Sequence, residues 1–93
     1  MKKAKIIWKK TKDGGKRKIP PIDIIFYPMI KINNYKESMN WSFFLINKEI
    51  ISDYETIAEI DFLMDNAPRF LLKSNVEFTL HEGAMEIAKG KIE

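Results

Sequence analysis

The single histidine, His81, is the first residue whose chemistry could support acid–base catalysis or metal binding. On strand spacing, Glu77 and Thr79 share its outward face, and Glu82 follows it directly. One imidazole with neighbouring carboxylates is a poor metal set, because protein zinc sites ordinarily supply three or four well-placed ligands. We therefore interpret His81 as an exposed strand residue and expect no metal site.

The carboxylates of Glu59 and Asp61 form a second candidate pair. In a strand they share one face and lie about 7 Å apart. Paired carboxylates can hydrolyse glycosidic bonds, but that chemistry needs a cleft built by a larger scaffold. The chain also has no cysteine and no Gly-x4-Gly-Lys-Ser/Thr phosphate loop. We predict no catalytic residue, no cofactor and no nucleotide bound by this chain alone.

Positive charge gathers at the start of the chain. Residues 1–18 carry nine Lys or Arg and one Asp, a formal charge of +8, whereas residues 19–93 carry −5. The candidate binding residues flank an Asp-Gly-Gly turn signal: Lys9, Lys10, Lys12, Lys16, Arg17 and Lys18. Two interpretations stay open, because this segment could attract an anionic partner or could complement the acidic remainder within the fold.

Alternating apolar residues predict strands at both ends of the chain. Residues 4–9 place Ala4, Ile6 and Trp8 on one face, and residues 76–81 are the clearest strand. The closing strand, residues 86–92, contains Ala88 and Gly90, which indicate a close approach to another backbone.

The middle of the chain is less regular. Strands are expected over 22–27, limited by Pro28 and continuing at 29–32, and over 41–46, which reads as buried on both faces. Residues 47–49 are expected to turn. Residues 56–64 alternate as a strand, with Met64 inward, although a helix over 54–64 also fits. Residues 69–72 are expected to be a short strand or an extended link.

These elements predict the fold class all-β, with a small closed or partly open antiparallel β-barrel of six to seven strands. The whole chain, residues 1–93, forms a single domain on this interpretation. No apolar run resembles a signal peptide or approaches the length of a membrane span. We therefore expect a cytoplasmic location and no membrane partner.

Two ordered sets of residues resemble a known family. The first is Ala4 to Trp8, the basic loop Lys12-Asp13-Gly14-Gly15-Lys16-Arg17, and Pro20-Pro21 leading to Ile24-Ile25-Phe26-Tyr27. The second comprises residues 56–62, the segment Val76-Glu77-Phe78-Thr79-Leu80-His81-Glu82-Gly83, and residues 87–92. In this order they resemble the C-terminal β-barrel domain of translation elongation factor Tu, whereas residues 30–55 match poorly.

The resemblance implies a non-enzymatic binding module with a translation-related role. In the full elongation factor this barrel follows a GTPase domain and another barrel, and it helps to bind aminoacyl-tRNA and other domains. A protein partner or self-association is expected here, because the basic patch is local and the net charge is only +3. The alternative is an RNA- or tRNA-binding domain using the loop Lys9–Lys18, with Trp8, Tyr27 and Tyr35 as nearby aromatics.

Overall fold

A computed structural model describes residues 1–10, 19–35 and 41–93. Within these ranges the chain forms seven strands and one short 3₁₀ helix. In chain order they are β1 (Lys2–Trp8), β2 (Ile25–Phe26), β3 (Met29–Ile32), β4 (Phe43–Ser52), β5 (Glu55–Phe62), η3 (Arg69–Leu71), β6 (Glu77–Glu82) and β7 (Met85–Ile92).

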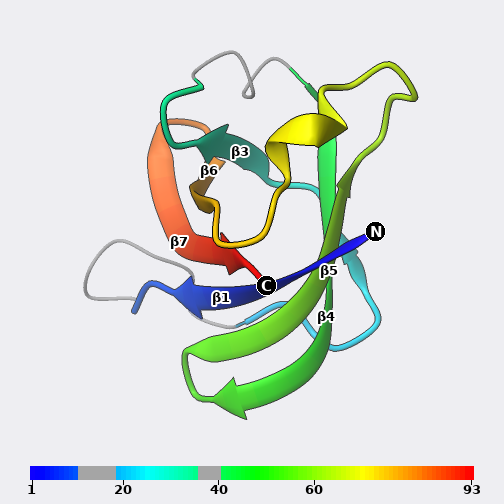
Figure 1. The fold of residues 1–93 in the computed structure, drawn as a ribbon. Helices are drawn as coiled ribbons and strands as arrows, with labels where there is room; N and C mark the ends of the chain where they lie inside the picture. Colours follow the sequence, from blue (N-terminus) through cyan, green and yellow to red (C-terminus); the bar gives the residue numbers. More distant parts are fainter. Residues whose placement is uncertain (11–18, 36–40) are drawn as a thin grey trace.

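The strands form one antiparallel sheet in the order β2-β4-β5-β1-β7-β6-β3. The sheet curls into a half-barrel, with β4 and β5 on one side and β7, β6 and β3 on the other (Figure 1). This architecture confirms the predicted small, partly open antiparallel barrel. The first and last strands are neighbours, since Ala4 pairs with Ile92 and the amide of Glu93 donates to the carbonyl of Lys3 at 2.9 Å.

The core lies inside the curled sheet and follows the predicted alternation. On β1, Ala4, Ile6 and Trp8 are buried, whereas Lys3, Lys5 and Ile7 face outward. The same pattern holds on β5, which settles the choice between strand and helix for this segment in favour of the strand. The largest fully buried side chains come from six strands and the segment after η3: Phe43, Phe62, Phe78, Ile6, Ile30, Ile32, Leu45, Ile60, Leu72, Leu80, Ile87 and Ile92.

The expected turn at residues 47–49 is wrong, because β4 continues through it to Ser52. Asn47 is a turn-forming residue type, but here it is completely buried and hydrogen-bonded through its side chain. The register of the β4–β5 pairing shifts between Asn47 and Glu49, as at a β-bulge, and the two strands remain paired on both sides of the shift. The expected burial of residues 41–46 on both faces is also wrong: Phe43 and Leu45 are buried, whereas Phe44 and Ile46 are only half-buried.

Residues 69–71 form the 3₁₀ helix η3 instead of the expected strand or link. Arg69 explains this local structure, because its guanidinium donates to the carbonyls of Phe62, Met64 and Asp65 at 2.8–3.0 Å. These bonds hold the chain in a compact turn after β5. Since β5 ends at Phe62, Met64 is exposed and does not point inward as expected.

The second strand is shorter than expected: only Ile25 and Phe26 form β2, which pairs with β4. Before it, Asp23 adopts a positive φ of 65° and its amide donates to the carbonyl of Asn47. Pro28 then separates β2 from β3, as predicted. At the other end of the chain, β6 begins at Glu77, so Val76 is half-buried just before the strand.

The predicted close approach at Gly90 is present, but its partner is a side chain and not a backbone. A Cβ atom at Gly90 would overlap the ring of Phe78, its cross-strand partner on β6. The absent side chain therefore makes room for an aromatic ring in the core. Gly83 serves a different purpose, because its φ of +59° closes the β6–β7 turn.

Candidate functional site

Two of the six predicted binding residues lie in the described part of the chain, and both have partners within the fold. Lys9 Nζ lies 3.2 Å from Oε2 of Glu86 on β7. Lys10 Nζ lies 4.9 Å from the centroid of the Tyr54 ring, a cation–π contact. The other four, Lys12, Lys16, Arg17 and Lys18, lie outside the described residues.

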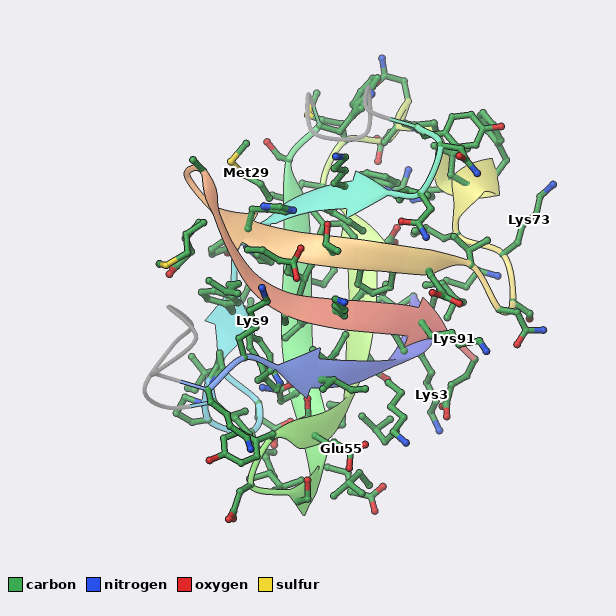
Figure 2. All side chains as sticks on the ribbon, turned by 90° about the vertical axis from the view of Figure 1, so that its left-hand side faces the viewer. Lys3, Lys9, Met29, Glu55, Lys73 and Lys91 are labelled. Carbon is green, nitrogen blue, oxygen red and sulfur yellow. The ribbon has the colours of Figure 1, made fainter. Side chains whose placement is uncertain are left out.

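The outer face of the sheet carries further lysines that the sequence interpretation did not join to this site. Because Ala4, Ile6 and Trp8 point inward on β1, Lys3 and Lys5 point outward. On β7 the same alternation exposes Lys89 and Lys91 between buried neighbours. Figure 2 looks onto this face, with β3, β6, β7 and β1 in front and Lys3, Lys9 and Lys91 labelled along it.

Strand pairing brings these lysines together across 80 or more residues of sequence. Lys5 on β1 lies directly opposite Lys91 on β7, and Ile7 lies opposite Lys89. Thr79 on β6 lies between Lys89 and Lys31 in the same cross-strand row. The adjacency of β1 and β7 therefore adds a second basic segment to the one at the start of the chain.

A shallow groove follows this pairing. Two adjoining hollows of about 280 and 370 Å³ both include Ile7 and Lys89 in their walls. The smaller one continues to Lys10 and Tyr54, and the larger one continues to Lys5, Lys91 and Glu77. We call this surface the lysine groove and define it by Lys5, Lys9, Lys10, Lys89 and Lys91, with Ile7 and Tyr54.

Some lysines of the groove form ion pairs with carboxylates of the fold, and others do not. Lys5 Nζ lies 3.2 Å from Oε2 of Glu55, and Lys9 is paired with Glu86. Among the described residues, neither Lys89 nor Lys91 has an ion pair within 4 Å. The β7 side of the lysine groove therefore holds the cations best placed to meet an external anion.

Two of the residues first considered for catalysis, His81 and Asp61, have hydrogen-bond partners within the fold. Thr79 Oγ1 lies 2.7 Å from Nε2 of His81, and both side chains are half-buried. The predicted shared outward face is thus confirmed, although His81 is less exposed than expected. Asp61 accepts hydrogen bonds from Arg69 Nε at 2.9 Å and from the amide of Phe62 at 2.8 Å, so it fixes the turn after β5.

The described ranges contain no group of three or more His, Asp or Glu residues that could hold a metal ion. Of the aromatic residues considered for stacking, Trp8 is 3% exposed and belongs to the core, whereas Tyr27 and Tyr35 are exposed. Tyr27 lines a separate hollow of about 300 Å³ with Met29, Trp41 and Leu63, away from the lysine groove. Trp8 and Tyr54 both line the groove, but only Tyr54 is exposed.

Comparisons with protein families, with curated proteins and with solved structures find no match for this chain. In the described residues, no helix is long and apolar enough to cross a membrane.

The sequence did carry a signal for the missed lysines. Lys89 and Lys91 alternate with Ala88, Gly90 and Ile92, which marks them as outward residues of the closing strand. The sequence did not reveal that they lie beside Lys5, because they are more than 80 residues away from it. Only the pairing of β7 with β1 places these lysines on one surface.

Proposed function

We propose that this chain is a non-catalytic binding module whose lysine groove contacts an acidic segment of a partner protein. The observation that carries this proposal is the pair of β7 cations, Lys89 and Lys91, which lack an ion pair among the described residues. Complementary charge steers association and fixes the orientation of a partner. An acidic segment would supply the counter-charge that the fold does not supply here.

A protein partner fits this face better than a nucleic acid. The lysines are interspersed with Glu55, Glu77 and Glu86, so the electrostatic potential changes sign over short distances. The net charge of the chain is only +3. A nucleic-acid backbone presents uniform negative charge and would meet these carboxylates, whereas a protein segment can match mixed signs.

RNA, including tRNA, is the second candidate partner. The +8 charge of residues 1–18 supports it, and so does the exposed ring of Tyr54 beside Lys10 in the groove. We propose the resemblance to the C-terminal barrel of elongation factor Tu, with a translation-related role in the cytoplasm, for the binding module whichever of the two partners it has. Its support is the order of the two sets of end motifs along the chain.

The groove is tested by removing its two unpaired cations. In a Lys89→Gln/Lys91→Gln variant, we expect binding of a labelled glutamate-rich peptide to weaken by about tenfold, since each exposed ionic contact contributes up to about 1 kcal/mol. The matched control is Lys2→Gln/Lys73→Gln, which removes the same charge outside the groove. Fluorescence anisotropy at low and at physiological salt measures both affinities.

The outcomes separate the two candidates. Equal weakening in both variants would show that binding depends on net charge alone, and it would contradict a specific role for the lysine groove. A labelled single-stranded RNA or tRNA that binds more tightly than the peptide, and loses affinity in the Lys89/Lys91 variant alone, would make RNA the partner of this surface.

A further inference from the structure

We infer that the lysine groove recognises an extended peptide in which an acidic side chain and an apolar side chain stand two residues apart. This inference rests on the proposed function and goes beyond it, because it specifies the conformation and the residue pattern of the partner. It is carried by the position of Ile7 relative to the cross-strand pair of Lys5 and Lys91.

Ile7 is an apolar side chain placed where charge would be expected. It lies on the outer face of β1 between Lys5 and Lys9, and 51% of it is exposed. Both hollows of the groove include Ile7 and Lys89 in their walls, so Ile7 lies at their junction. Covering an exposed apolar side chain with an apolar group of a partner lowers the free energy of the complex.

The cation pair beside Ile7 selects a carboxylate. Lys5 and Lys91 face each other directly across β1 and β7, and like charges in this arrangement repel. Glu55 partly balances Lys5, but Lys91 makes no ion pair among the described residues even though Glu77 is its partner on β6. A carboxylate bound over this pair would relieve the repulsion.

The distance between Ile7 and the pair of Lys5 and Lys91 determines the spacing of the matching residues in the peptide. Along β1, Lys5 and Ile7 are two residues apart, as are Lys91 and Lys89 along β7. This repeat is about 7 Å, which is also the distance between alternate side chains of an extended peptide. A peptide lying along the groove with its acidic residue over Lys5 and Lys91 would therefore place the residue two positions away over Ile7.

The junction of the two hollows at Ile7 is less suited to a nucleobase. Ile7 offers no aromatic face for stacking, and Lys10 already lies over the Tyr54 ring at 4.9 Å. Nucleobases gain most of their binding free energy on aromatic platforms. The observations thus favour a peptide, and a nucleic acid becomes an alternative outcome of the test.

Three labelled peptides of equal length and charge test the pattern. In the first, each glutamate is two positions from a leucine; in the second, the same residues are rearranged so that the spacing is three; in the third, serine replaces leucine. We expect the first to bind about tenfold more tightly than the other two, as is typical of covering one apolar side chain. The Ile7→Thr variant should abolish this preference and still bind all three peptides.

Ile24→Thr is the matched control, because Ile24 is 55% exposed and does not line the groove. It should keep the preference for the first peptide. If none of the acidic peptides binds, the proposed function itself fails. If all three bind equally to the native chain, or if the preference survives Ile7→Thr, the pattern is wrong while the proposed function stands.

Two further measurements can overturn the inference. A single-stranded RNA that displaces the first peptide from the native chain and binds more tightly would identify a nucleic acid as the occupant. Sedimentation that reveals concentration-dependent dimers of the native chain, lost in the Ile7→Thr variant, would identify a second copy of the chain as the occupant.

Discussion

The indole Nε1 of Trp8 donates a hydrogen bond of 3.0 Å to the hydroxyl of Thr56, a residue 48 positions later in the chain. Thr56 in turn donates to Oδ1 of Asn47 at 2.7 Å, and Asn47 Nδ2 donates to the carbonyl of Pro20 at 2.8 Å. This buried polar chain joins β1, β5, β4 and the segment that leads to β2. It satisfies side chains that would otherwise be costly to bury.

Replacing Thr56 by valine should therefore destabilise the fold more than most single substitutions. The change keeps the shape but leaves the indole N–H of Trp8 and Oδ1 of Asn47 without their partner, which costs about 2–4 kcal/mol in the free energy of unfolding. Urea denaturation followed by Trp fluorescence measures the loss. Thr79→Val, which removes one half-buried hydrogen bond to His81 on the outward face of β6, is the control, with an expected loss of about 0.5–1.5 kcal/mol. Similar losses in the two variants would contradict the importance of the buried chain.

Gly90→Ala should destabilise the fold by about 1–3 kcal/mol, because the new methyl group would collide with the Phe78 ring in a closely packed core. The double variant Gly90→Ala/Phe78→Leu tests the cause, since the smaller side chain leaves room for the methyl group. We expect the double variant to be more stable than the sum of the two single changes by about 1 kcal/mol. Additive changes in thermal or urea unfolding would show that another contact limits residue 90.

Arg69→Lys should open the turn after β5 while leaving the sheet intact. Lysine keeps the positive charge, but it cannot reproduce the fork that contacts Asp61 and the carbonyls of Phe62 and Met64. We expect faster amide hydrogen exchange at Ala67, whose amide donates within this turn, and little change at Ile6 in β1. Unchanged exchange at Ala67 would mean that η3 holds the turn without the arginine.

Asp23→Asn should lower the pKa of Lys48. Nζ of Lys48 lies 2.6 Å from Oδ1 of Asp23, and this hydrogen bond, with the charge of Asp23, raises the pKa of Lys48 above 10.5. Because the pKa is raised in the folded state, the stabilising contribution of this pair is present below pH 10.5 and disappears as the pH rises through the folded-state pKa.

An NMR titration of the Lys48 side chain measures this change. Asparagine also tolerates the positive φ of residue 23, so the backbone should be preserved. Glu59→Gln is the matched comparison and should lower the pKa less, since Glu59 is the weaker of the two acidic influences. A larger shift in Glu59→Gln than in Asp23→Asn would reverse this assignment.

Local alternation was a sufficient guide to most of the sheet. Ala4, Ile6 and Trp8 face the core because a strand sends successive side chains to opposite sides, whatever strands lie beside it. The same reasoning failed at Asn47, whose residue type favours a turn in isolation. Here Thr56 and Pro20 satisfy its side chain, so β4 continues, and those partners lie 9 and 27 residues away.

The candidate site also contains residues that the sequence predicted and residues that only the structure revealed. Its first members, Lys9 and Lys10, were predicted because basic residues cluster within one segment of the sequence. Lys89 and Lys91 were not predicted as site residues, although their alternation with Ala88, Gly90 and Ile92 is typical of outward strand positions. Whether they meet Lys5 depends on which strand pairs with β7, and that choice is decided by the packing of the whole sheet.

By itself, the sequence determined the all-β class, the inward face of most strands and the basic character of one end of the chain, because each depends on neighbouring residues. The tertiary structure alone decided that Ile7 lies among five lysines of a single groove and that Glu55 and Glu86 already balance two of them. These relationships arise from strand pairing between distant segments. Their physical basis is the burial of one shared core, which selects a strand order that no local pattern specifies.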